Sequence, residues 1–246
     1  MGLFDWFKKY EVIPFRFIIN GNEVVGYLYS PKKWNQKGIV YLHGGFDFYP
    51  KPEAYKDVIA YANAGWAVLL IKYDTEGWKN IASQDYAKDV QEAIDAAMQF
   101  IARAKPRKLF LMGVSRGCAV AYGAYAAAPS DVWDGGVFIA GPTHISTLKK
   151  TTQIPPATLE KMLSYFKISP IDLNYSPKKS TAMLLVYGGQ DIIIPAAQGV
   201  LMATKLNLQT GKDFFALNYG HDLAKEKETQ FIILKWLESH YPAPRH

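Results

Sequence analysis

Apolar residues in this chain fall mainly into short, nearly continuous runs separated by polar and glycine-containing segments. Runs of this length, bounded by turn residues, are typical of strands in a sheet that is covered on both faces. They predict strands at residues 38–42, 66–71, 108–112, 135–140, 181–187 and 214–217.

Between these runs the apolar residues recur with a helical period, most clearly over residues 85–104, and Pro106 ends this pattern. One face of this helix is expected to be buried and the opposite face exposed. The expected buried face holds Tyr86, Val90, Ala93, Ile94, Ala97 and Ile101, and the expected exposed face holds Lys88, Glu92, Asp95 and Gln99. Further helices are predicted at about 53–64, 157–165, 195–208 and 223–240, the last burying Phe231, Leu234 and Trp236 or their neighbours.

Strand-like residues on both sides of Asn20-Gly21-Asn22 predict a hairpin from residues 12–19 and 23–29. After it, strands alternate with helices, which predicts an α/β fold with a mostly parallel sheet and helices on both faces. We expect one domain over residues 1–246. Residues 142–179 are more than a connector between two strands needs, so they predict a small cap insertion over one end of the sheet.

Candidate chemistry begins at Gly113-Val114-Ser115-Arg116-Gly117, a G-x-S-x-G pattern between an apolar run and a stretch of small residues. In a sharp strand-to-helix turn, glycines two positions either side let the strand and the helix approach closely, while the serine is strained. The pattern also occurs by chance in loops, so its context carries the prediction. It predicts a nucleophile elbow with Ser115 at a helix N-terminus, where developing negative charge is favoured.

A serine hydroxyl is a poor nucleophile without a base and a third group that orients the base. Asp191 follows one predicted strand in Gly188-Gly189-Gln190-Asp191, and His221 follows the last strand in Tyr219-Gly220-His221-Asp222. Singly, Asp191 also fits a turn residue and His221 a structural histidine. Because catalytic groups in open α/β sheets collect at the carboxyl ends of strands, the order Ser115, Asp191, His221 predicts nucleophile, orienting acid and base. Asp222 directly adjoins His221 and is badly placed to orient it.

Acyl transfer also needs two hydrogen-bond donors for an oxyanion. The backbone N–H of Arg116, the residue after the nucleophile, is the first expected donor. The second is expected from His43-Gly44-Gly45-Phe46. Gly45 and Phe46 stay open as alternatives, and His43 is expected to hold this loop by a hydrogen bond.

Together these residues resemble the α/β-hydrolase superfamily over most of the chain, from about Gly21 onward. The elbow, Ser169-Pro170 and the Gly-x-x-Asp-x-x-x-Pro pattern from Gly188 to Pro195 are similar to prolyl-oligopeptidase-like peptidases and their esterase relatives. Two features depart from those peptidases: the propeller that restricts their substrates has no counterpart here, and Phe46 stands where many carry proline. The resemblance implies a free-standing hydrolase domain that acts on esters more readily than on peptides.

The resulting hypothesis is a carboxylesterase-like serine hydrolase that works through an acyl-enzyme on a small-molecule ester or amide. Two alternatives stay open. One is a peptidase or acylaminoacyl hydrolase with the same triad, and the other is a non-catalytic α/β-hydrolase domain that binds a ligand. No Cys/His cluster has the spacing of a metal site, so we expect neither metal nor cofactor.

Composition and charge narrow the setting. The net charge is +6, but the 28 Lys and Arg residues are spread along the chain, which favours a solvated basic surface over nucleic-acid binding. A single cysteine, Cys118, leaves no internal disulfide, and no apolar run is long enough to span a bilayer, so we expect a cytoplasmic protein. The aromatic residues 1–9 leave two alternatives, weak membrane-surface contact and packing on the sheet edge. The oligomeric state stays open.

Overall fold

A sheet of eight strands forms the centre of the computed structural model, which describes residues 9–19, 21–45, 52–72, 85–166, 168–176, 179 and 182–240. The strand order is β1-β2-β4-β3-β5-β6-β7-β8; β1 and β2 are antiparallel to their neighbours, and the other strands are parallel. The predicted mostly parallel α/β sheet is confirmed. The strands are β1 (Tyr10–Ile19), β2 (Asn22–Pro31), β3 (Lys37–Leu42), β4 (Ala67–Leu70), β5 (Lys108–Val114), β6 (Gly135–Ile139), β7 (Met183–Gly188) and β8 (Phe214–Leu217).

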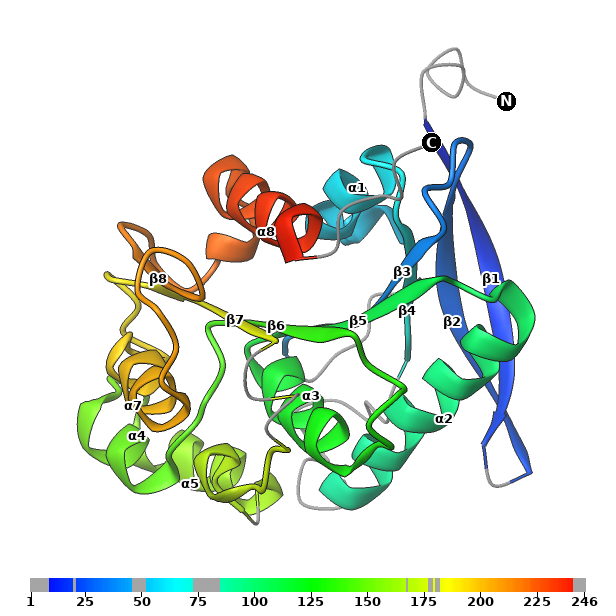
Figure 1. The fold of residues 1–246 in the computed structure, drawn as a ribbon. Coiled ribbons are helices and arrows are strands. Elements are labelled where there is room, and N and C mark those ends of the chain that lie inside the picture. Colours follow the sequence, from blue (N-terminus) through cyan, green and yellow to red (C-terminus); the bar gives the residue numbers. More distant parts are fainter. Residues whose placement is uncertain are drawn as a thin grey trace.

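Helices cover both faces of this sheet (Figure 1). On one face lie α1 (Lys56–Asn63) and α8 (Lys227–His240), with the short 3-10 helices η2 (Pro52–Ala54) and η5 (Leu223–Lys225) beside them in the chain. The other face carries α2 (Tyr86–Ala104), α3 (Arg116–Ala127), α4 (Ile145–Thr151), α5 (Pro156–Tyr165) and α7 (Ala197–Leu206), and η4 (Pro170–Asp172) follows α5 in the chain. The buried side chains form two apolar clusters, one on each side of the sheet. Residues of β3, β4, β6 and β7 are buried throughout, as expected of strands covered on both faces.

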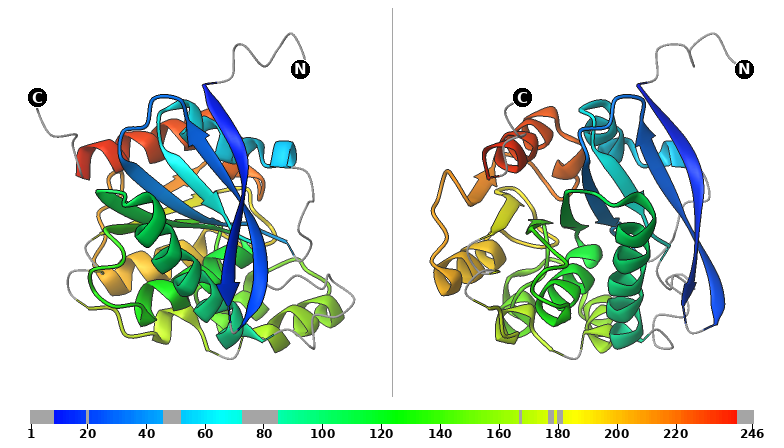
Figure 2. Two further views of the ribbon diagram at one scale, coloured as in Figure 1. Left: turned by 90° about the vertical axis from the view of Figure 1, so that its right-hand side faces the viewer. Right: turned by 45° about the vertical axis from the view of Figure 1, so that its right-hand side comes forward.

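The predicted hairpin is present as β1 and β2, paired from Tyr10 opposite Pro31 to Ile19 opposite Asn22. Figure 2 shows it as a long twisted ribbon along one side of the molecule, at the opposite end of the sheet from β8. The turn residue Asn20 lies outside the described residues. Because the hairpin forms one edge, the parallel strands that follow it occupy the rest of the sheet.

Two predictions about helix faces are wrong. Glu92, expected on the exposed face of α2, is buried together with Asp89 and Phe100, because α2 packs against α3 as well as β1 and its buried surface exceeds one stripe. Phe231, expected to be buried in α8, is 65% exposed, whereas Trp236 is buried against the sheet as expected, together with Ile233 and Leu237. Phe231 and Trp236 are five residues apart, which separates them by about 140° around an α-helix, so one buried face cannot hold both.

Residues 142–179 contain α4, which the sequence did not predict, and α5, which it did. Leu148 of α4 and Leu159 of α5 join the apolar cluster that also holds α3. Backbone and hydroxyl contacts then tie the end of α4 to the loop after β7: Gln153 N–H donates to Ile192 O (2.9 Å) and Thr152 Oγ1–H to Ile193 O (2.8 Å). A cap function for these residues stays a prediction.

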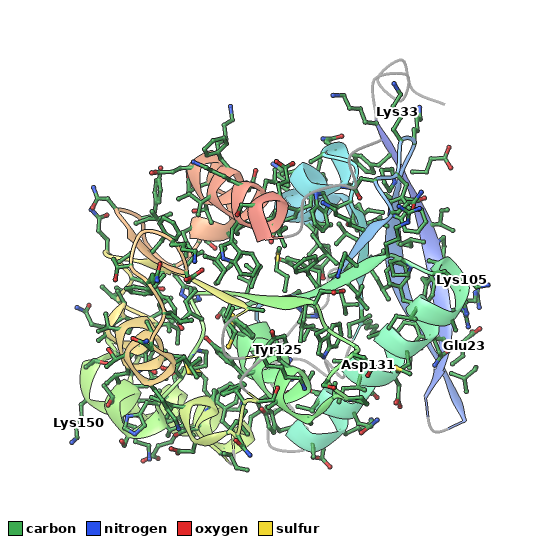
Figure 3. The ribbon with its side chains drawn as sticks, viewed as in Figure 1. Glu23, Lys33, Lys105, Tyr125, Asp131 and Lys150 are labelled. Carbon is green, nitrogen blue, oxygen red and sulfur yellow. The ribbon has the colours of Figure 1, made fainter. Side chains whose placement is uncertain are left out.

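Side chains fill the space between the helices and the sheet. In Figure 3, Tyr125 points from α3 into this interior, whereas Lys105 and Lys150 lie at the outside. Within the described ranges no helix combines the length and apolar character needed to cross a membrane. Nor do the same residues bring three or more His, Cys, Asp or Glu side chains together in a way that could hold a metal ion.

Candidate active site

The turn between β5 and α3 is centred on Ser115, whose backbone has φ 52° and ψ −118°. A positive φ is strained for a residue with a Cβ and persists only where surrounding contacts fix it. Here the Ser115 N–H donates to the Ile139 carbonyl of β6 (2.8 Å), and the Ser115 carbonyl accepts from the Cys118 N–H (3.0 Å). The chain therefore makes the sharp strand-to-helix turn that the G-x-S-x-G pattern predicts.

Close backbone packing explains the two glycines of the pattern. A Cβ at Gly113 would lie 2.7 Å from Cα of Cys118, and one at Gly117 would lie 2.2 Å from the Leu42 carbonyl oxygen. Both distances are far below van der Waals contact. The glycines thus let α3 lie directly against β5 and the end of β3.

Ser115, His221 and Asp191 come together at the carboxyl ends of β5, β8 and β7. His221 Nε2 lies 2.8 Å from Ser115 Oγ, and His221 Nδ1 lies 2.7 Å from Asp191 Oδ2. The Asp191 side chain is fully buried, while His221 stays 22% exposed. A proton on Nδ1 that the carboxylate accepts leaves the Nε2 lone pair facing the serine hydroxyl.

The Asp191 carboxylate is fixed from both sides. Its Oδ1 accepts the N–H groups of Ile193 (2.8 Å) and Ile194 (2.9 Å), which leaves Oδ2 for His221. The neighbouring Asp222 is 83% exposed and pairs with Lys225 (3.1 Å) instead of the imidazole. The geometry therefore brings Asp191, and not Asp222, to the histidine.

The loop after β3 lies against the serine. A Cβ at Gly44 would be 3.2 Å from the Ser115 Cβ, and Gly45 has φ +74°, a conformation that favours glycine. Arg116 is the first residue of α3, with its N–H at the helix N-terminus. Phe46, the other donor candidate, lies outside the described residues.

His43 holds this loop from within. Its ring is buried, and its Nδ1–H donates to the Gly44 carbonyl (2.9 Å). Burial lowers the pKa of His43 from its ordinary value to about 4, so the imidazole is neutral near pH 7. The structure gives this histidine the loop-holding hydrogen bond expected from the sequence.

Cys118 lies immediately behind the turn and is fully buried. Its thiol contacts the Gly113 carbonyl (2.9 Å), and burial raises the pKa of the thiol well above its usual range. Because the thiolate is the reactive form, this cysteine is an inert packing residue.

The sequence predicts a role for the backbone N–H of Arg116 but none for its side chain. Arg116 Nη2 donates to Asp89 Oδ2 (2.8 Å), and the guanidinium carbon lies 4.4 Å from the centre of the Tyr165 ring. Asp89 also accepts the Tyr165 hydroxyl. The three residues come from α3, α2 and α5, so no local pattern links them. The signal available in the sequence is an aspartate, Asp89, next to an apolar position of an amphipathic helix.

Comparison with known proteins identifies a family to which this chain is similar. A model of the prolyl oligopeptidase family matches residues 71–238, more than half of the chain, including Ser115, Asp191 and His221. No curated protein sequence matches the chain.

Solved structures of similar fold include both peptidases and esterases. Acylaminoacyl peptidase of Pyrococcus horikoshii is 17% identical with a TM-score of 0.70, over 97% of this chain and 42% of that one. Carboxyl esterase 2 of Tuber melanosporum is 16% identical with a TM-score of 0.70, over 93% of this chain and 85% of that one. An esterase of Pyrococcus furiosus is 14% identical with a TM-score of 0.69, over 94% and 91%. At these identities the likeness shows the fold alone, and this chain spans about two fifths of the peptidase.

The resemblance drawn from the sequence is thus confirmed at two levels. The sheet order, the turn at Ser115 and the similar structures identify an α/β-hydrolase fold. By its family match, the chain belongs to the prolyl oligopeptidase family.

Proposed function

We propose that the chain is a serine hydrolase that cleaves carboxylic esters through an acyl-enzyme. The observation that carries this proposal is the pair of contacts at His221, 2.8 Å from Ser115 Oγ and 2.7 Å from Asp191 Oδ2. A hydroxyl, an imidazole and a carboxylate linked at these distances are what a serine needs to become a nucleophile.

In the first half of the reaction, Ser115 Oγ attacks the acyl carbonyl while His221 Nε2 takes its proton. Asp191 holds Nδ1–H and stabilises the imidazolium that forms. The oxyanion accepts hydrogen bonds from the backbone N–H of Arg116 and from Gly45 or Phe46. Each such donor typically lowers the barrier by about 3 kcal/mol.

The first half ends when the first tetrahedral intermediate collapses: its bond to the alkoxide breaks, His221 protonates the alkoxide, and an alcohol leaves the acyl-enzyme. In the second half, water enters, loses a proton to His221 and attacks the acyl carbon. Collapse of the second tetrahedral intermediate breaks its bond to Ser115 Oγ, which takes the proton back from His221, and the acid is released. The fully buried Asp191 keeps the imidazole in one orientation through both halves.

Ester cleavage is the reaction to test first. The chain aligns with 85% and 91% of the lengths of two esterases, which supports this choice. The alternative is hydrolysis of peptides or acylaminoacyl substrates by the same residues, and its support is the family match together with the acylaminoacyl peptidase of similar fold. Cytoplasmic location, membrane contact by residues 1–9, absence of nucleic-acid binding and cofactor independence stay predictions.

The experiment is labelling with a fluorophosphonate probe, which reacts with an activated serine. We expect the wild type to be labelled, Ser115→Ala to be unlabelled, and His221→Ala to be labelled at least about a hundredfold more slowly because the base is lost. Ser146→Ala is the matched control: Ser146 Oγ also lies near a histidine, 3.3 Å from His144 Nε2, but it is exposed. Folded wild type that stays unlabelled would contradict the enzyme and favour the ligand-binding alternative.

A second measurement separates the two substrate classes. The same acyl group is offered as a p-nitrophenyl ester and as a p-nitroanilide, and N-acylaminoacyl p-nitroanilides are added. A higher kcat/KM on the esters supports the proposal. Preference for the acylaminoacyl amides would replace it with the peptidase alternative.

A further inference from the structure

The ion pair between Arg116 and Asp89 has no part in the triad chemistry, yet it lies directly beside the nucleophile. Their side chains are 2% and 0% exposed, and the two atoms that meet are 2.8 Å apart. Burying two charges carries a large desolvation cost, and an apolar pair of similar volume often stabilises a fold equally well. Stability alone is therefore a weak reason for this ion pair, and a second contact of the guanidinium offers a better one.

The Arg116 side chain reaches the loop that carries the second expected oxyanion donor, Gly45 or Phe46. Its Nη1 lies 3.5 Å from the Gly45 carbonyl oxygen, while Nη2 is held by Asp89. A peptide unit is planar, so a contact that holds the Gly45 carbonyl also orients the N–H of residue 46, which shares its plane and is one of the two candidate oxyanion donors. At Gly45, with φ +74°, the backbone has no Cβ to restrict it, and a cation on its carbonyl supplies the missing restraint.

Tyr165 locks the guanidinium in this position. Its ring packs on the guanidinium at 4.4 Å, and its hydroxyl donates to the same Asp89 oxygen that accepts from Arg116. A planar cation that stacks on an aromatic ring while two of its nitrogens donate to two different acceptors is a feature that arginine provides and lysine does not. Residues from α2, α3, α5 and the loop after β3 thus meet at one side chain.

We propose that the Arg116 side chain is a positioning residue that holds the Gly45 loop in the geometry that receives the oxyanion, with Asp89 and Tyr165 fixing the guanidinium. This inference rests on the serine hydrolase function proposed above. The side chain acts through Gly45 and not on the substrate. Its loss therefore weakens stabilisation of the transition state and leaves substrate binding and the Ser115–His221–Asp191 geometry in place.

The test is the double variant Asp89→Asn/Arg116→Met, which removes both charges so that neither is left buried alone. Arg103→Met is the matched control, because Arg103 also donates to a backbone carbonyl, that of Arg16, and stacks 4.9 Å from the Phe15 ring, but far along α2. We expect kcat on a p-nitrophenyl ester to fall about thirtyfold in the double variant, somewhat less than for loss of an oxyanion donor itself. KM and the pH profile of kcat/KM stay as in the wild type, and Arg103→Met keeps the wild-type kcat.

Tyr165→Phe keeps the ring and removes only the hydroxyl to Asp89, so it decides the case if the double variant does not fold. We expect a fall of about threefold in kcat at constant KM, in line with loss of one hydrogen bond. Unchanged kcat in a folded double variant, or in Tyr165→Phe when the double variant is unfolded, overturns the inference. So does a loss with an equal rise in KM or a shifted pH profile, which reports a displaced triad. Absence of wild-type labelling would instead overturn the proposed function.

Discussion

His43, in the loop that lies against Ser115, is almost fully buried. Its pKa is lowered to about 4 by burial, whereas an unfolded chain returns it to about 6.5. The folded state therefore binds a proton less readily than the unfolded state. Stability that His43 contributes is fully present above about pH 6.5 and is lost as the pH falls toward 4.

This linkage gives a prediction at the residue scale. Between about pH 7.5 and about pH 5, the preference of the unfolded chain for protonated His43 should lower the free energy of unfolding by roughly 2 kcal/mol. Urea unfolding of the wild type and of His43→Asn at both pH values gives the loss of stability on acidification for each protein. The difference between the two losses is the His43 contribution, because the other titrating groups cancel. Equal losses in the two proteins would show that His43 does not titrate as its burial requires.

At the residue scale, local sequence predicts some contacts of the site and not others. Ser115, Asp191 and His221 each follow a strand within a short glycine-containing motif, so their meeting at one edge of the sheet could be anticipated. The contacts of Arg116 with Asp89 and Tyr165 span 27 residues or more between separate helices, and periodicity carries no information on such pairs. Phe46, one of the two candidates for the second oxyanion donor, is outside the described residues, and that role stays a prediction.

At the scale of elements, α3 depends on its close approach to β3. An alanine at position 117 would gain up to about 1 kcal/mol from helix propensity. Its Cβ, however, would lie 2.2 Å from the Leu42 carbonyl oxygen, which is backbone and cannot turn aside. Overpacking of this kind typically costs about 1–3 kcal/mol, so the clash outweighs the propensity.

Gly117→Ala should accordingly lower the free energy of unfolding by about 2 kcal/mol and slow fluorophosphonate labelling, because the turn at Ser115 shifts with α3. Gly220→Ala is the matched control, since a Cβ there would meet nothing within 4 Å. Chemical unfolding and labelling rates measure both effects. The account of the turn fails if the two variants are equally stable.

Elements with a strong period were predicted well, and those shaped by tertiary contacts were not. β8 and the long helix α2 lie close to their predicted bounds. The short α4 was missed because it buries a single residue, Leu148, and shows no amphipathic repeat. Phe231 was assigned to the wrong face of α8 because it lies about 140° around the helix from Trp236, the residue that packs on the sheet.

On the scale of the whole molecule, residues from the range 142–179 contact α3 at both of its ends. Tyr165 covers Arg116 at the N-terminus, as described above. At the C-terminus the buried Lys179 donates to the Ala126 and Ala128 carbonyls (3.3 and 2.5 Å), where a cation complements the helix dipole. Tyr125 adds a hydrogen bond from its hydroxyl to the Lys179 carbonyl (3.2 Å). The helix α3, which begins directly after Ser115, is thereby tied at both ends to residues of the predicted cap.

The wide spacing of Ser115, Asp191 and His221 along the chain has a consequence for folding kinetics. Ser115 and His221 are 106 residues apart, and Asp191 and His221 are 30 apart, so they meet only once β5, β7 and β8 occupy one sheet. Closing such long loops is slow compared with forming helices. During refolding from urea, phosphonate reactivity should therefore return later than the far-ultraviolet helical signal. Simultaneous recovery would contradict this order. If labelling returns after a lag, the reactivity of Ser115 reports when β8 joins the sheet.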